Sequence, residues 1–166
     1  MSLTGKPSLT NASPITNDGF WPDVAMGDLM SKYRIPSEYA DDTIQWGLSL
    51  AVVRVNEHLE RIKQLILSES VETFEDYLQA NSSPIFNREL MHVQYENAVF
   101  SRAKALLLKQ FVTMNRRQIA ENEAKESEQT EMYWLDQSQA SVASLMKAFF
   151  PDEDFMRKSN LHVALL

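Results

Sequence analysis

The residues in this chain that come nearest to a metal-binding pattern are Glu89 and His92, which form a Glu-x-x-His pair. On a helix such a pair places both side chains on one face, and ferritin-like bundles use two copies to hold two metal ions. The other histidines are His58 and His162, and neither follows a glutamate at this spacing. Because the second half-site is missing, we interpret Glu89 and His92 as a chance pairing on a solvated face.

Other catalytic arrangements are equally incomplete. His58 lies beside Glu57 with no partner arranged for it, so we expect a surface or interface residue and not a base. The glycines stand far apart, which excludes a phosphate-binding glycine loop, and no Gly-x-Ser-x-Gly elbow occurs. The acidic run 152–154 has the ligand type for a divalent cation, but acids near a chain end are usually solvated. We therefore predict no catalytic residue, no metal and no cofactor, and a protein that is not an enzyme.

The charge balance disfavours a nucleic-acid-binding protein. The chain has 16 Lys and Arg against 23 Asp and Glu, which gives a formal net charge of -7 at pH 7. A surface that binds duplex DNA tightly would have to be built against this field. The most notable basic pair, Arg116 and Arg117, is followed by glutamates and favours a salt-bridged face. We expect a protein that can lie beside DNA without binding it specifically.

The cysteine count and the lengths of the apolar runs limit the cellular compartments in which we expect the protein. The absence of cysteine removes disulfides, thiolate catalysis and thiolate metal sites, and it fits assembly in a reducing cytoplasm. No signal-peptide pattern is present, and no apolar run approaches the roughly 20 residues of a membrane span. We expect a soluble protein without membrane contact.

By composition the chain divides into three parts. Residues 1–19 are too poor in large apolar groups to offset the entropy of ordering, so we predict a flexible N-terminal arm. Residues 20–151 carry regular apolar spacing and are predicted to form one helical domain, which Pro151 ends. Residues 152–166 are predicted to form a C-terminal tail.

The strongest helical pattern lies between 38 and about 67. Apolar residues recur there every three or four positions and trace one stripe along a helix. Gly47 interrupts the pattern and indicates either a kink or a close contact with another helix. The stripe consists of Ile44, Leu48, Val52, Val55, Leu59, Ile62 and Ile66.

Three further helices complete the predicted fold. Asp23 is placed to cap a short helix from 24 to about 33, a second long helix is predicted over 87 to about 118, and a last one over 131–150. The connector 68–86 should touch the core at Phe74, Tyr77 and Leu78, with a short helical turn left open, and the polar stretch 115–129 is either a helix extension or a loop. The fold class is therefore all-α, a helical bundle with two long helices, a short N-terminal helix and a C-terminal helix.

The ends of the chain supply the predicted interface with partners or other subunits. Phe20, Trp21 and Asp23 stand where the arm joins the helical domain. The tail closes on an apolar segment that is hard to leave in water, so it should pack on its own core or, by a slight preference, on a neighbouring subunit. The tail residues of this predicted interface are Leu161, Val163, Leu165 and Leu166.

Several short segments together resemble one known family. They are Phe20-Trp21-Pro22-Asp23, then Val55, Asn56 and Leu59, then Tyr95, Glu96, Ala98 and Val99, and finally the stretch Asp136 to Leu145. Each is similar in kind and order to a segment of the head completion proteins of contractile-tailed bacteriophages, the GPL family. The likeness covers about residues 20–166. It departs from the family at Gln139, where a second aromatic is expected, and in the connector 68–83.

This resemblance implies a structural virion protein of a phage or prophage. Such a protein docks beneath the portal after DNA packaging, helps retain the DNA and presents a platform for tail joining. Its implied partners are the portal protein, tail-side completion proteins and other copies of itself. The copies would form a ring, dodecameric to match the portal. If the ring forms only on the portal, the isolated protein is expected to be a monomer. The implied location is the head-tail junction of the virion, with the host bacterial cytoplasm during assembly.

Two other functions compete with this one. A cytoplasmic helical interaction or regulatory domain would bind a partner helix in an apolar groove. An enzyme of the di-iron type comes third and would take up iron. Assembly state separates the head completion protein from the regulatory domain, because only the head completion protein should form rings.

Overall fold

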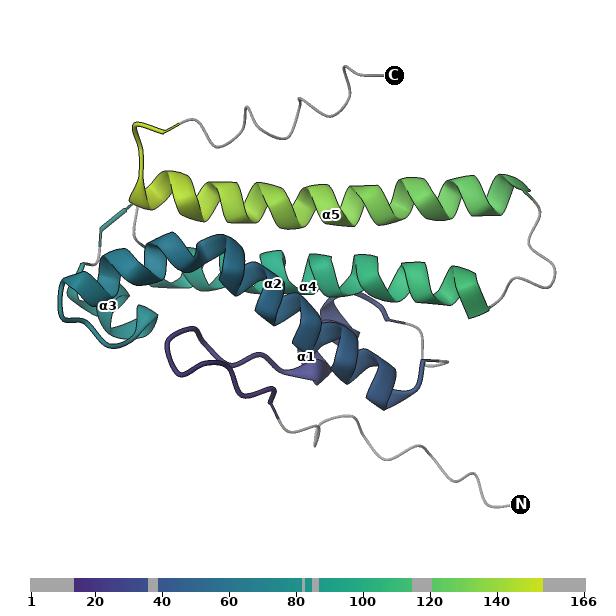
Figure 1. The fold of residues 1–166 in the computed structure, drawn as a ribbon, viewed down its shortest axis with the longest axis horizontal. Coiled ribbons are helices and arrows are strands. Elements are labelled where there is room, and N and C mark those ends of the chain that lie inside the picture. The colour runs from purple at the N-terminus through teal and green to yellow at the C-terminus, as the bar shows by residue number, and fades with distance from the viewer. Residues whose placement is uncertain (1–13, 36–38, 82, 85–86, 115–120, 154–166) are drawn as a thin grey trace.

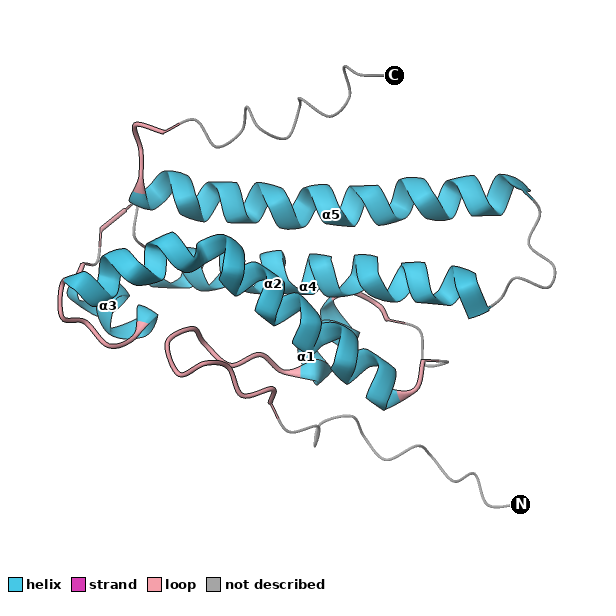
Figure 2. Ribbon diagram, viewed as in Figure 1, coloured by secondary structure: helices cyan, strands magenta, loops and turns pink. Residues whose placement is uncertain are grey.

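The computed structural model describes residues 14–35, 39–81, 83–84, 87–114 and 121–153, without the side chains of 111–129. In this part of the chain there are five helices and no β-strand, only an isolated bridge between Ile15 and Val24 (Figure 2). The helices are α1 (Met26–Lys32), α2 (Asp41–Ser68), α3 (Phe74–Ala80), α4 (Arg88–Met114) and α5 (Glu121–Phe149). The predicted all-α class is confirmed.

Helix α4 is the centre of the arrangement. It runs antiparallel to α5 along the long axis of the molecule, and α2 packs against it as well (Figure 1). The short helices α1 and α3 lie against α2, and α3 also contacts α4. The core therefore forms where three long helices meet, with the short helices closing its edges.

The stripe predicted on α2 is the buried side of that helix. All seven of its apolar residues are buried, and Ala51 joins them. Gly47 lies in close contact with α4, because a Cβ added there would lie 3.2 Å from the Cδ2 atom of Leu107. Of the two readings of this glycine, the structure shows the close helix contact.

The connector between α2 and α4 contains a formed helix, α3. Its first turn is capped by Thr73, whose Oγ1 accepts a hydrogen bond from the backbone N–H of Asp76 at 3.0 Å. Phe74, Tyr77 and Leu78 are buried, which confirms the predicted contact with the core. The short helical turn that the sequence left open is a seven-residue helix.

Two boundaries differ from the prediction. Asp23 does not cap α1, whose N-cap is Ala25 in extended conformation with no side-chain hydrogen bond, so that prediction was wrong. Helix α5 begins at Glu121 and not near 131, so the residues from 121 onward in the polar stretch are helical. Residues 115–120, including Arg116 and Arg117, lie outside the described residues.

Candidate interaction surfaces

The aromatic pair at the start of the domain lies inside the protein. Phe20 is 5% and Trp21 3% exposed, and their rings meet edge to face with centroids 4.9 Å apart. The Trp21 ring also stacks on Tyr95 at 5.1 Å with planes within 5°, and lies 4.8 Å from Phe74. Both were predicted as interface residues. In this conformation their side chains face the protein's own core, so they reach an interface only through the chain segment that they hold in place.

A polar network closes that segment onto the helices. The Asn17 side-chain N–H donates to the Tyr95 hydroxyl at 2.7 Å and to the Pro22 carbonyl at 2.9 Å. The Tyr95 hydroxyl donates to Asn56 at 2.7 Å, and the Asn56 amide donates to Asn17 at 2.8 Å. Burial raises the pKa of Tyr95 well above its ordinary value, although the Asn17 hydrogen bond acts the other way. The loop is therefore held by α2 and α4 at once.

Asp18 and Asp23 fix the same loop at its surface. Asp18 accepts hydrogen bonds from the backbone N–H groups of Phe20 and Trp21 at 3.0 and 3.1 Å and forms an ion pair with Lys63 at 2.7 Å. Burial alone would raise the pKa of Asp18, but these contacts hold it below its ordinary value. The exposed Asp23 accepts the Asn17 backbone N–H at 2.8 Å.

Part of the predicted arm is thus placed against the helices. Residues 14–19, assigned to the flexible arm by composition, lie along α2 and α4, while residues 1–13 lie outside the described residues. Sequence reasoning missed Asn17, because a single asparagine among many polar residues carries no signal until its partners are known.

The residues considered for metal binding have other partners. The His92 Nε2 lies 2.6 Å from a carboxylate oxygen of Glu75 on α3, and Arg88 pairs with the other oxygen at 2.5 Å. Glu89 is exposed and is not the partner of His92. Among the described residues, no three His, Asp or Glu side chains are grouped so that they could hold a metal ion.

The acidic run at the end of α5 is tied to α2. The Arg61 guanidinium makes two hydrogen bonds to the Glu153 carboxylate, at 2.7 and 2.5 Å, and also lies over the Phe150 ring at 4.1 Å. Asp154 and the tail residues Leu161, Val163, Leu165 and Leu166 lie outside the described residues. The structure therefore places the start of the tail beside α2.

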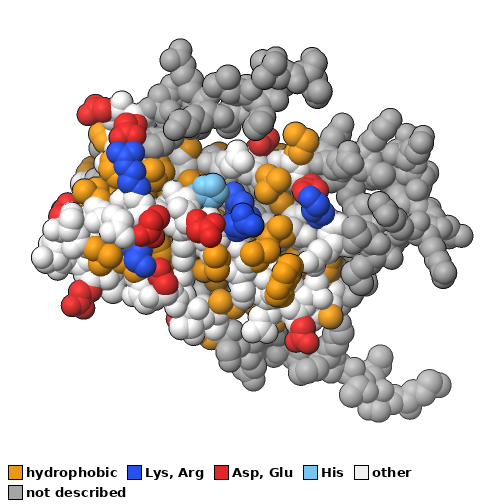
Figure 3. Space-filling view, in the orientation of Figure 1, with side chains coloured by type: hydrophobic (Ala, Val, Ile, Leu, Met, Phe, Trp, Pro, Cys, Tyr) orange, Lys and Arg blue, Asp and Glu red, His pale blue; other side chains and the backbone are white. Residues whose placement is uncertain are grey.

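The outer side of α2 exposes two large apolar residues beside unpaired cations. Trp46 is 57% and Val53 53% exposed, seven residues apart on one helical face. Arg54 and His58 are also exposed on α2, and the half-buried Arg102 approaches from α4. We call these five residues the basic face. Figure 3 shows a histidine near the middle of the side that α2 covers, with basic side chains and an acidic side chain beside it.

The arginines of the basic face form no ion pair among the described residues, although the charge of the exposed Glu57 carboxylate acts to raise the pKa values of His58 and Arg102. Neither Arg54 nor Arg102 forms an ion pair with any described residue, and the buried Nε of Arg102 has no hydrogen-bond acceptor there. Burial, followed by the nearby Arg54, lowers the pKa of Arg102. Burial, followed by Arg102, lowers the pKa of His58. The balance of charge here is positive on a protein that is acidic as a whole.

A second exposed surface lies on the other side of the body, between α1, α4 and α5. It contains an open groove of about 520 Å³ whose wall includes Val93, Glu96, Tyr133 and Trp134. Val93 is 58% and Tyr133 54% exposed, and Glu89 is exposed one turn before Val93. We call Glu89, Val93, Glu96, Tyr133 and Trp134 the groove face.

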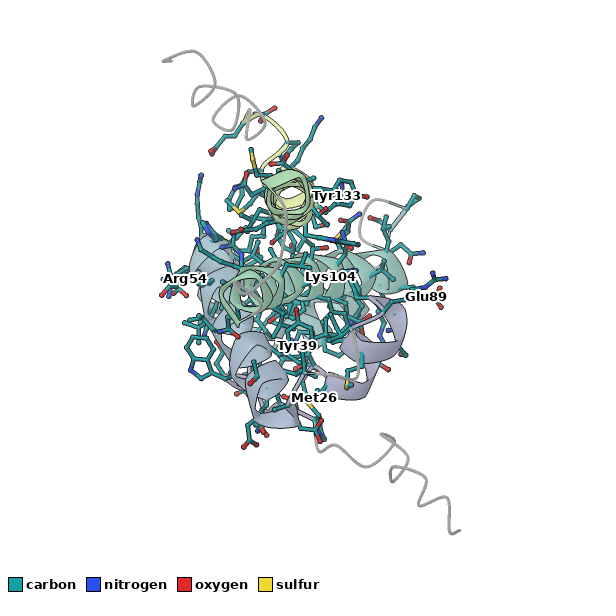
Figure 4. The ribbon with its side chains drawn as sticks, turned by 90° about the vertical axis from the view of Figure 1, so that its right-hand side faces the viewer. Met26, Tyr39, Arg54, Glu89, Lys104 and Tyr133 are labelled. Atoms are coloured by element: carbon teal, nitrogen blue, oxygen red, sulfur yellow. The ribbon has the colours of Figure 1, made fainter. Side chains whose placement is uncertain are left out.

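The two faces point in opposite directions. In Figure 4, Arg54 projects from one side of the helical body and Glu89 lies on the opposite side, while Tyr133 lies beside α5 at the top of the view, turned away from Arg54. No helix among the described residues is long and apolar enough to cross a membrane. The arrangement defines a class of protein, a helical body with two separate exposed surfaces that carry large apolar side chains.

Comparison with known proteins identifies the family within that class. Residues 15–149 match the model of the phage head completion protein (GPL) family, and the chain belongs to this family. It is 31% identical over 116 residues, 69% of this chain and 75% of the relative, to the probable head completion/stabilization protein of Haemophilus phage HP1 (strain HP1c1). No solved structure matches the chain. The resemblance found in the sequence is confirmed, and the protein is a structural component of phage head assembly.

Proposed function

We propose that this protein binds beneath the portal of a DNA-filled head, helps to retain the DNA and provides the platform to which the tail attaches. It acts there as a ring of copies, twelve where the portal is twelvefold. The observation that carries the proposal is that a member of the head completion family exposes large apolar side chains on two opposite sides. Such surfaces mark contacts with other proteins.

The charge of the chain supports a position beside DNA. A net charge of -7 would repel a duplex that passes through a ring of these subunits, so DNA could move past without sticking. The protein would then retain DNA by narrowing or closing the exit and not by binding nucleotides. This position places the protein at the head-tail junction of the virion.

We further propose that the C-terminal tail contacts a neighbouring subunit through Leu161, Val163, Leu165 and Leu166. The chain leaves α5 beside α2, where Arg61 holds Glu153, so the tail starts at the surface of the body. Asp23 is our candidate for a polar contact with the portal, because its carboxylate is exposed on a loop that Phe20 and Trp21 fix in the core.

The direct test is attachment to heads. DNA-filled heads from an infection that lacks this protein are mixed with the purified full chain and sedimented, and the pellets are imaged by electron microscopy. We expect the protein in the pellet, a ring at the portal vertex and restored tail joining. Failure to sediment with heads would refute the proposed function, and a small oligomer without rings would favour the regulatory alternative.

A matched pair of variants tests the tail. Deleting residues 161–166 should leave the thermal unfolding midpoint unchanged and abolish attachment to heads. Replacing the polar tail residues Arg157 and Lys158 with alanine serves as the control and should attach normally. Normal head completion by the truncated chain would refute the role of the tail.

A further inference from the structure

We propose that neighbouring copies of this chain meet head to tail, with the basic face of one copy packed against the groove face of the next. The inference deepens the proposed function, on whose ring it rests, by naming the two surfaces that form the contact between subunits. Both surfaces consist of described residues, so the contact does not depend on either terminus.

The basic face combines exposed apolar side chains with unpaired arginines, as expected of a surface that binds another protein. Trp46 and Val53 offer apolar side chains that are more than half exposed, and large aromatic residues of this kind are common anchors in protein contacts. Beside them, Arg102 is half-buried with a buried Nε that lacks an acceptor, and Arg54 adds a second unpaired cation. A carboxylate on the partner would pair with the exposed Arg54 and offset the repulsion between the two arginines.

The groove face offers the complementary chemistry. Val93 and Tyr133 are exposed at the open groove, where they offer apolar surface to a large side chain such as the Trp46 indole. Glu89 projects one turn before Val93 and makes no ion pair with any described residue. Glu96 shares Lys32 with Asp28, and Lys104 lies over the Trp134 ring at 4.2 Å, so the carboxylates of Asp28, Glu89 and Glu96 outnumber the two lysines by one.

The charges and the opposite directions of the two faces favour a head-to-tail contact between copies over a two-fold contact. A two-fold contact would place like against like and bring Arg54 and Arg102 of both copies together, which like charges disfavour. A head-to-tail contact joins unlike faces, leaves one of each free and repeats until the chain of subunits closes into a ring. Because the two faces lie on opposite sides of the body, each copy can bind two neighbours at once (Figure 4).

A protein partner fits the basic face better than DNA does. Exposed Trp46 and Val53 flank the arginines and would remain in water against a phosphate backbone, whereas a partner groove would cover them. The field of the whole molecule, with a net charge of -7, also opposes a duplex. We assign a second copy of this chain as the occupant, because its groove face carries the exposed Glu89 beside exposed Val93 and Tyr133.

Thiol cross-linking tests the contact directly, because the chain has no cysteine of its own. Two full-length variants, Val53→Cys and Val93→Cys, are prepared separately, and each change removes an exposed side chain from a helix surface. A bifunctional thiol reagent that spans one helix diameter, about 10 Å, is added to each alone and to their mixture, in solution at rising concentration and on heads. We expect dimer bands in the mixture and none with either variant alone.

The possible results separate the inference from the proposed function. Cross-linking of Val53→Cys alone would overturn the proposal, because it indicates a two-fold contact. So would the absence of a mixed product both in solution and on heads. If the variants still sediment with heads and restore tail joining, the proposed function stands while this contact falls.

Charge reversal gives an independent test. Arg54→Glu and Glu89→Arg should each weaken self-association by about tenfold or more, since like charges then face each other. The double variant, and an equal mixture of the two single variants, restore opposite charges at every contact and should recover association. Lys147→Glu and Glu72→Arg change exposed residues outside both faces and should have no effect. Recovery that fails in both the double variant and the mixture would overturn the pairing of these faces.

A measurement of binding between the full chain and duplex DNA tests DNA as the other candidate occupant of the basic face. We expect no binding at moderate salt and no change on Arg54→Glu. DNA binding that this substitution abolishes would overturn the assignment to a second copy.

Discussion

Replacing Trp21 with alanine should unfold the protein at a much lower temperature, because Trp21 supports the core and not a surface. Its side chain is 3% exposed and packs between Phe20, Phe74 and Tyr95. Truncation of a buried aromatic residue to alanine costs about 3 to 5 kcal/mol, a large part of the total stability of a typical domain. At about 2 to 4 °C per kcal/mol for a chain of this size, the unfolding midpoint should fall by roughly 6 to 20 °C.

A second tryptophan provides the matched control. Trp46 is 57% exposed on α2, so Trp46→Ala removes the same side chain from the surface and should change the free energy of unfolding by less than about 0.5 kcal/mol. Circular dichroism during heating and urea titration measures both variants. Sedimentation with heads and measurement of self-association then separate the roles of the two residues. Trp46→Ala should weaken self-association, while the folded fraction of Trp21→Ala should still associate.

Two results would contradict the assignment of Trp21 to the core and of Trp46 to the surface. An unfolding midpoint of Trp21→Ala within 2 °C of the original, together with lost association, would mean that Trp21 faces a partner as the sequence pattern first indicated. Loss of stability in Trp46→Ala of similar size would mean that the outer side of α2 is covered within the monomer.

Three further predictions concern the support of the N-terminal loop and the packing of α2. Tyr95→Phe should lower the free energy of unfolding by about 1 to 3 kcal/mol in urea titration, because the amides that bond its hydroxyl lose their partner, whereas Tyr133→Phe should not. Folding lowers the pKa of Asp18, so the stability that its carboxylate contributes is present above the ordinary pKa of 3.8 and is lost as the pH falls through the lower folded-state pKa. Thermal unfolding from pH 6 to 2 should therefore show less acid destabilisation in Asp18→Asn than in the original protein. An unchanged pH profile would contradict this. Gly47→Val should cost about 1 to 3 kcal/mol in the same titration, because the added side chain overlaps Leu107, and an equally stable variant would show that α2 can move away from α4.

The periodicity of apolar residues was enough to predict the all-α class and the existence of four main helices, but not helix α3 or the start of α5. The stripe on α2 recurs every three or four residues, and burial of that stripe is the only way in which so many aliphatic side chains leave water on one helix. Local patterns of this kind depend on neighbours within one or two turns, which the sequence contains in full.

Exposed surfaces were much harder to predict, because they depend on residues that are far apart in the chain. Phe20 and Trp21 are large and aromatic, which suits an interface as well as a core, and only the position of Tyr95 and Phe74 decided that they are buried. Asn17 gave no signal alone, because its role needs Tyr95 from a helix 78 residues later.

The sequence by itself therefore determined the helical class, the family and the apolar stripe of α2, since short-range spacing and motif residues carry that information. The tertiary structure alone decided which side of each helix stays exposed. Arg54 and Arg102 approach each other only because α2 packs against α4, and Val93 and Tyr133 share a groove only because α4 pairs with α5. Charge and exposure at a surface are properties of several helices together, and no single stretch of sequence contains them.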